Sequence, residues 1–296
     1  MKTRKITAGF LKPLLAPRPR VSHKGDYGHV LVVAGSRGMT GAAVLAARAV
    51  LKAGAGLVTV ACPAPERRLV APALPEAMTF GAASKNGCFA LKAAGQVAKF
   101  AAARRVDLVL IGPGLSSSGQ APSFVLRLLK ELRLPAVIDA DALNAVAAAG
   151  AFPKAFAPGI ITPHPGEARR LLGAAVADRP AAAAALAAMS GGAAVLKGAG
   201  TLISDGVSAL ENTTGGPALA KGGSGDVLAG LCAGFLVQAG LSRGFSLKTA
   251  FESAALAVYL HGLAGDLAAR KFTERGVLAS EIIEFLPAAL RRLGSR

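Results

Sequence analysis

The sequence predicts a single α/β domain in which helices cover a mainly parallel β-sheet. Two observations support this prediction. Short apolar segments that end in glycine or proline recur along the chain and alternate with helical segments, as in successive βαβ units. The chain has 296 residues, of which 52% are hydrophobic and 36 are glycine, so it can bury one large core with closely packed elements.

The first βαβ unit follows a basic leader. We separate this leader, residues 1–20, from a domain that spans residues 21–296. HVLVVAG (29–35) is predicted to be a strand, RGMTGAAVLAARAVLKAGAG (37–56) a helix with a glycine stop, and GLVTVACP (56–63) a second buried strand. Because a helix joins the two strands, they should lie parallel in one sheet.

The rest of the chain continues this alternation and then becomes helical. Four further strands are expected, at 106–114, 135–141, 159–167 and 193–200. Residues 201–212 should form a small hairpin centred on Asp205-Gly206, and the alanine run 181–188 a surface helix. The last helices are expected at 226–240, about 246–270 and about 278–293.

Composition limits the classes of partner. The formal net charge of +17 favours anionic ligands, but the basic residues are scattered and only 5% of the chain is aromatic, which disfavours nucleic acid. No apolar stretch reaches the length of a membrane span, and the leader lacks the apolar segment of a secretory signal. Cys62, Cys88 and Cys232 lack metal spacing and indicate reduced thiols in a cytoplasmic protein.

The stretch KGGSGDVLAG (221–230) carries the strongest chemical signal. Its glycine-rich turn runs into a helix start, so unpaired backbone N–H groups and the positive helix end suit a transferring phosphoryl group. A carboxylate here would repel that group unless it accepts a proton from an attacking hydroxyl, so Asp226 is the candidate general base. The alternative is a plain tight turn with Asp226 as the helix N-cap.

Further motifs follow the predicted strands, where ligands bind in open α/β sheets. They are Gly35-Ser36-Arg37-Gly38, Gly112-Pro113-Gly114, Asp139 with Asp141, Thr162-Pro163-His164, and Lys197-Gly198. The loop GSRGMTG (35–41) lacks the G-x-G-x-x-G spacing and the second strand lacks a terminal acidic residue, so a redox dinucleotide fold is disfavoured. This loop can still hold a substrate phosphate through its backbone.

Several of these residues have both a functional and a structural interpretation. Lys197 is followed by a glycine turn, which suits the binding of a nucleotide. The alternative is that Lys197 is a surface charge. His164 is fixed between two prolines and suits a donor near phosphate, although a lone histidine is more often structural. Glu167 suits the binding of Mg²⁺, directly or through water. The alternative is an acidic residue in the first turn of a helix at 167–172. Asp139 and Asp141 are expected to be a turn and cap pair before any role in the site.

Several ordered motifs together resemble the ADP- or ATP-dependent NAD(P)H-hydrate dehydratases of the ribokinase-like superfamily. The motifs are KGDYGHVLVVAGS, GMTGAAVLAARAVLKAGAGLVTV, IGPGL, DADALN, TPHPGE, VLKGAGT and KGGSGDVLAG, and the resemblance runs from about Lys24 to Leu290. It implies a three-layer α/β/α sandwich with a mainly parallel central sheet. It also implies a repair reaction: with Mg²⁺, ADP or ATP phosphorylates the hydroxyl of (S)-NAD(P)H hydrate, and loss of phosphate restores NADH or NADPH.

The resemblance also assigns site residues. Asp226 matches the general base and a hydrate contact, and Glu167 matches a metal-linked acidic residue. The remaining hydrate contacts match Ala42, Ala43, Gly114 and His164. The anion hole matches the amides of Gly222, Gly223, Ser224 and Gly225. The nucleotide positions match Lys197, Gly198, Ala199, Gly200, Thr201 and Gly225.

The chain departs from the family in two respects. Residues 213–220 read TTGGPALA where relatives usually have an Asn-Pro-Gly-Met-Ala-like run. The leader is too short for the epimerase domain that many bacterial relatives carry, so we expect action on one epimer and a separate epimerase protein. Relatives are often homo-oligomers, and assembly is expected by resemblance.

Two rival functions remain open. A ribokinase-like small-alcohol kinase of the thiazole or hydroxymethylpyrimidine type would share Asp226 and the anion hole, but TPHPGE and GMTGAA argue against it. A catalytically idle nucleotide-binding protein would gain nothing from a carboxylate beside phosphate.

Overall fold

The computed structural model describes residues 3–15, 17–150, 152 and 157–294. In this part of the chain, ten strands form one central sheet in the order β1-β12-β11-β10-β9-β8-β7-β2-β3-β4. Neighbours are parallel except at the pairs β10-β11 and β11-β12, which are antiparallel. The predicted α/β fold with a mainly parallel central sheet is therefore confirmed.

The strands are short and mostly buried. Their bounds are β1 (Thr3–Lys5), β2 (His29–Val33), β3 (Leu57–Pro63), β4 (Met78–Ala82), β7 (Leu108–Ile111), β8 (Pro135–Ile138), β9 (Ala157–Ile161), β10 (Ala193–Leu196), β11 (Leu202–Ser204) and β12 (Ala209–Glu211). A separate small hairpin pairs β5 (Ser84–Lys85) with β6 (Cys88–Phe89).

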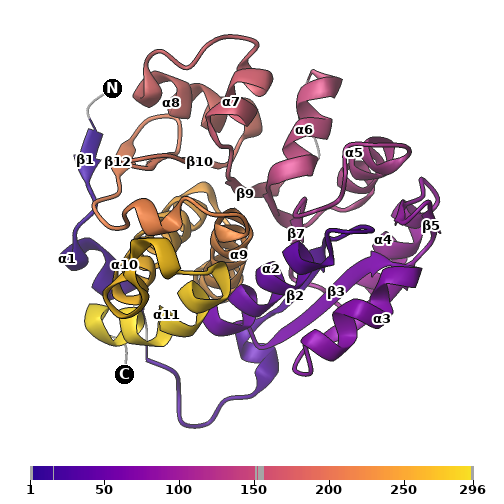
Figure 1. The fold of residues 1–296 in the computed structure, drawn as a ribbon, viewed down its shortest axis with the longest axis horizontal. Coiled ribbons are helices and arrows are strands. Elements are labelled where there is room, and N and C mark those ends of the chain that lie inside the picture. Colours follow the sequence, from indigo (N-terminus) through magenta and orange to yellow (C-terminus); the bar gives the residue numbers. More distant parts are fainter. Residues whose placement is uncertain (1–2, 16, 151, 153–156, 295–296) are drawn as a thin grey trace.

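Helices cover both faces of the sheet (Figure 1). One face carries α1 (Ala8–Leu11), α2 (Thr40–Ala53), α3 (Arg67–Val70), α9 (Ser224–Arg243), α10 (Leu247–Gly276) and α11 (Ala279–Leu293). The other face carries α4 (Ala93–Ala103), α5 (Ala121–Glu131), α6 (Ala140–Ala149), α7 (Pro165–Leu172) and α8 (Arg179–Ser190). The molecule therefore has the expected three layers.

The alternation of side chains along the strands creates two cores. In β2, Val30 and Val32 face the layer that contains α9, whereas Leu31 and Val33 face the layer that contains α5. All four side chains are fully buried. A strand that is apolar on both faces is what a parallel sheet covered by helices requires.

Small residues let α2 and α9 pack closely. A Cβ atom on Gly230 would lie 2.3 Å from the Ala46 carbonyl oxygen, and one on Gly234 would lie 2.5 Å from the Ala53 Cβ. Glycine is therefore needed at both positions of α9. This packing fixes the start of α9 against the start of α2, which lies at the carboxyl end of β2.

The helix α9 is apolar on nearly every side. Within the described residues it is the one helix long and apolar enough to cross a membrane, but 72% of its most apolar window is buried inside the fold. A helix at the centre of a core has the same composition. The contacts of α9 with α2, α10 and three strands account for its hydrophobicity.

The predicted strands and the C-terminal helices are all present, and most strands are shorter than expected. They end early because the residues after them form loops or the first turns of α6 and α7 at the carboxyl edge of the sheet. The hairpin at 201–212 also forms, with Asp205 Oδ1 accepting hydrogen bonds from the amides of Val207 and Ser208 at 2.9 and 2.6 Å.

Two segments differ from expectation. Part of the basic leader belongs to the sheet, because Thr3–Lys5 form β1 and pair with β12. The alanine run 181–188 lies in α8, and that helix is not a plain surface helix: Ala183 and Leu186 are fully buried against the sheet.

Candidate active site

The turn before α9 presents free backbone donors. Gly223 has φ of +89°, and a Cβ there would lie 2.6 Å from Leu45 Cδ1, so this position requires glycine. The amide of Ser224 donates to the Lys221 carbonyl at 3.3 Å, whereas those of Gly222, Gly223 and Gly225 make no hydrogen bond within the described part of the chain. The helix dipole of α9 stands behind these groups and favours an anion in front of them.

Asp226 lies in the first turn of α9, next to this turn. The N-cap of α9 is Gly223, without a side-chain cap, so Asp226 is not the N-cap. Its carboxylate makes no hydrogen bond or ion pair with any residue that the structure describes. Burial and the Asp139 and Asp141 carboxylates raise the pKa of Asp226, Lys197 opposes them, and the net value is about 6. A carboxylate with this pKa can exchange a proton near neutral pH.

Lys197 is held by carboxylates below α9. Its Nζ donates to Asp139 Oδ1 at 2.8 Å and lies 3.8 Å from Glu167 Oε2. Burial lowers the pKa of Lys197, but the two carboxylates outweigh burial and raise it. Lys197 therefore remains charged and links the ends of β8, β9 and β10.

Asp139 does not have the predicted cap role. Its carboxylate makes no cap hydrogen bond to α6 and instead binds Lys197 and the Thr162 hydroxyl, the latter at 2.7 Å. Gly112, at φ of +134°, makes room for this segment, because a Cβ there would lie 1.8 Å from the Asp139 carbonyl oxygen. Asp141 binds a loop amide, that of Ser116, at 2.9 Å. Both aspartates thus organise the carboxyl edge of the sheet.

Glu167 and His164 form a capping box at the start of α7. Glu167 Oε2 accepts from the His164 amide at 2.8 Å, and His164 Nδ1 accepts from the Gly166 amide at 2.9 Å. Burial raises the pKa of Glu167, the nearby Asp139 raises it further, and Lys197 opposes both. The side chain of His164 is half exposed and can still meet a ligand.

A second edge of the site joins α2 to the loop after β7. A Cβ on Gly114 would lie 3.0 Å from the Ala42 Cβ, so these two predicted hydrate contacts are neighbours. Ala42 is partly exposed, whereas Ala43 is fully buried and packs against Gly35. Of the two alanines, Ala42 is thus the one that a ligand can reach.

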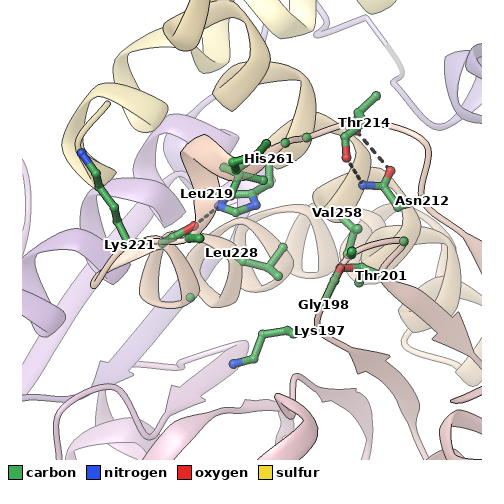
Figure 2. Close-up of a pocket in the computed structure, with 18 of the residues that line it drawn as sticks. Lys197, Gly198, Thr201, Asn212, Thr214, Leu219, Lys221, Leu228, Val258 and His261 are labelled. Carbon is green, nitrogen blue, oxygen red and sulfur yellow. Dashed lines mark hydrogen bonds between the residues drawn. The ribbon is translucent and has the colours of Figure 1, made fainter. Parts of the chain in front are cut away.

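A cavity of about 730 Å³ opens on the other side of the α9 turn (Figure 2). The predicted nucleotide segment Lys197–Thr201 lines it, together with Gly222, Ser224 and Gly225. Residues outside the predicted site also line it: Asn212, Thr214, Leu219, Leu228, Val258 and His261. The cavity is mainly apolar at Leu219, Leu228 and Val258 and polar near the turn, as a nucleotide requires.

The atypical loop 213–220 forms one wall of this cavity. It packs closely on α10: a Cβ atom on Gly262 would clash with Thr214 Oγ1, and a Cβ atom on Gly265 would clash with Leu219. The Thr214 hydroxyl donates to the Tyr259 carbonyl at 2.7 Å, and the Gly215 amide donates to Asp266 Oδ2 at 2.9 Å. The loop is thus fixed to α10.

His261 connects α10 to the α9 turn. Its Nε2 lies 3.2 Å from Ser224 Oγ, and burial lowers its pKa to about 4, so the ring is neutral at neutral pH. In Figure 2 this contact is the dashed line that ends at His261. The sequence signal that could have identified His261 is the segment HGLAG, in which a polar residue is followed by two glycines inside an apolar helix.

Comparison with solved structures identifies the class of fold. The chain superimposes on a ribokinase-like superfamily protein of Enterococcus faecalis with a TM-score of 0.85 and 29% identity, covering 99% of this chain and 97% of that one. It superimposes on the ADP/ATP-dependent NAD(P)H-hydrate dehydratase of Bacillus subtilis, co-crystallized with ATP/Mg²⁺, with a TM-score of 0.82 and 30% identity, covering 99% of both chains. The fold is thus ribokinase-like.

Sequence comparison gives the family. The chain belongs to the NAD(P)H-hydrate dehydratase family, whose profile matches residues 30–288. It is 43% identical over 98% of its length to the bifunctional NAD(P)H-hydrate repair enzyme Nnr of Moorella thermoacetica and covers 54% of that protein. It is 33% identical over 97% of its length to the ADP-dependent (S)-NAD(P)H-hydrate dehydratase of Listeria monocytogenes and covers 96% of it. The chain spans about half the length of the bifunctional relatives.

Proposed function

We propose that this protein uses ADP or ATP to dehydrate (S)-NAD(P)H hydrate and so restores NADH or NADPH. One observation carries the proposal: the carboxylate of Asp226, unpaired among the described residues, directly follows an amide-lined turn that borders the cavity. The name of the Listeria relative supports the substrate and the donor ADP. The Bacillus structure, co-crystallized with ATP/Mg²⁺, supports ATP as an alternative donor.

In this proposal Asp226 is the general base. It accepts the proton of the hydrate hydroxyl while that oxygen attacks the terminal phosphorus of the nucleotide. The amides of Gly222, Gly223 and Gly225 stabilise the charge on the moving phosphoryl group. The phosphorylated oxygen then leaves as inorganic phosphate as the ring nitrogen supplies an electron pair, and loss of a proton from the adjacent ring carbon re-forms the ring carbon–carbon double bond.

The cavity holds the nucleotide, and the edge at Ala42 and Gly114 holds the hydrate. The adenine ring of the nucleotide packs between Leu219, Leu228 and Val258, and its phosphates point to the α9 turn. Lys197 holds Asp139 and Glu167 in place beside the phosphates. His164 lies at the end of the same edge and donates to the hydrate. The two ligands then approach Asp226 from opposite sides.

The donor groups present fit Mg²⁺ bound mainly by the nucleotide. Among the described residues, no group of three or more His, Cys, Asp or Glu side chains is arranged to hold a metal ion. Mg²⁺ prefers phosphate oxygens, water and one or two carboxylates, so Glu167 would hold it through water. Bound there, Mg²⁺ would offset the negative charge of the phosphates.

The proposal extends to the pathway and the compartment. The chain acts on one epimer, and an epimerase activity supplies it from the other. We expect a homo-oligomer in the cytoplasm. Cys62, Cys88 and Cys232 are all free thiols, as a reducing compartment allows.

Product analysis tests this function. Purified protein receives NADH hydrate, Mg²⁺ and either ADP or ATP, and both the reduced-nicotinamide absorbance and inorganic phosphate are followed. We expect absorbance and phosphate to rise together, one for one, and only with nucleotide. A stable phosphorylated product without recovered NADH would show a small-alcohol kinase instead.

A further inference from the structure

The phosphate end of the cavity needs positive charge beyond backbone amides. Two lysines are among the residues that line the cavity, Lys197 and Lys221. The ammonium of Lys197 lies 2.8 Å from Asp139 and 3.8 Å from Glu167, so its charge is already neutralised. Even if one of its remaining N–H groups reaches a phosphate, Lys197 brings little net positive charge there, because the two carboxylates already balance it.

Lys221 is placed differently. It immediately precedes the amide-lined turn, and its ammonium extends away from Lys197 on the far side of that turn (Figure 2). Its Nζ donates to the backbone carbonyl of Arg275. It makes no ion pair with any carboxylate of the described residues. Lys221 is therefore a cavity-lining cation with a neutral partner.

The partner carbonyl belongs to a strained end of α10. Thr273 has φ of +65° and ψ of 159°, which breaks the helix before its last residues. A β-branched residue rarely adopts positive φ, and such strain persists where the surroundings enforce it. The break leaves the Arg275 carbonyl beside Lys221 as an acceptor that water or a ligand oxygen can replace.

We infer that Lys221 binds the phosphate chain of the nucleotide, by exchanging the Arg275 carbonyl for a phosphate oxygen. A hydrogen bond from an ammonium to a charged phosphate oxygen is stronger than one to a neutral carbonyl. Lys221 and the amides of Gly222 and Gly223 then face the phosphates together. The inference rests on the proposed nucleotide cavity but not on the identity of the second substrate.

Binding measurements without hydrate test this role. The dissociation constants of ADP, AMP and adenosine are measured by calorimetry for the wild type, Lys221→Met and Lys221→Arg. Lys130→Met, on the exposed face of α5, removes the same charge far from the cavity and serves as the control. Lys221→Met should weaken ADP about tenfold or more and leave adenosine within about twofold, whereas Lys221→Arg and Lys130→Met bind ADP nearly as the wild type does.

Three results would overturn the inference. Equal ADP affinity in Lys221→Met and the wild type would show that Lys221 does not touch phosphate. Equal weakening of ADP and adenosine would show that Lys221 only supports the cavity wall. An equal loss in Lys130→Met would assign the effect to net charge. Absence of hydrate turnover in a wild type that binds ADP would reject the proposed function and leave this test valid.

Discussion

Asp226 combines burial and negative neighbours in a way that suits a base. Burial and the charges of Asp139 and Asp141 hold the proton more tightly than in water, while Lys197 limits the effect. The resulting pKa of about 6 leaves the carboxylate ionised at neutral pH and still basic. A carboxylate with the ordinary pKa would be ionised as well, but it would be a weaker base.

The pH dependence of turnover follows from this pKa. Because the base must be ionised, kcat/KM should fall about tenfold per unit as the pH drops below about 6, and stay level above it. Initial rates between about pH 5 and 8 measure the profile. A level profile across that window would contradict the assignment, and the residual rate of Asp226→Asn should lack this acid limb.

The residues of the site differ in how far the sequence could predict them. Asp226 and its glycines are consecutive, so local physics predicts both the free amides and the carboxylate. Asp139 was expected to be a cap, because its actual partner, Lys197, is 58 positions away and meets it only in the folded sheet. His261 was missed for the same reason, since Ser224 lies 37 positions earlier.

At the level of elements, the start of α9 decides the geometry of the proposed anion hole. Gly223 adopts a left-handed conformation against Leu45 of α2, so the close packing of the two helices and the free amides depend on one position. Helical elements were predictable from apolar runs and glycine stops. Their ends were less so: α7 begins at Pro165, before the expected residue 167, and α10 continues beyond the expected residue 270 to Gly276, across a break at Thr273.

Alanine substitutions at the neighbouring residues Gly222 and Gly223 compare a position that needs glycine with one that does not. Gly223→Ala should lower stability by about 1–2 kcal/mol from its φ alone, clash with Leu45, and reduce turnover by about 10²-fold. Gly222→Ala has no positive φ, and no described atom lies within 4 Å of its added Cβ, so its thermal unfolding should match the wild type. Wild-type turnover in Gly223→Ala would show that the turn does not form the anion hole.

At the level of the whole molecule, the sheet brings distant segments to one edge. Loops after β2, β7, β8, β9 and β10 meet the start of α9 there, although they span most of the chain. The fold class was predictable because βαβ units impose parallel strands with a shared carboxyl edge. The proposed nucleotide cavity was only half predictable, because its other wall comes from loop 213–220 packed on α10, and no local pattern reports that contact.

The central claim is that the nucleotide and the hydrate meet at Asp226, and Asp226→Asn tests it most directly. Hydrate turnover and ADP affinity are measured side by side for the variant and the wild type. Because the pKa of Asp226 is raised from 3.8 to about 6, its ionisation costs the fold stability as the pH rises through that window, and the variant should be at least as stable at neutral pH. We predict that it binds ADP and loses about 10²–10⁴-fold in turnover. Turnover at the wild-type rate would contradict the account.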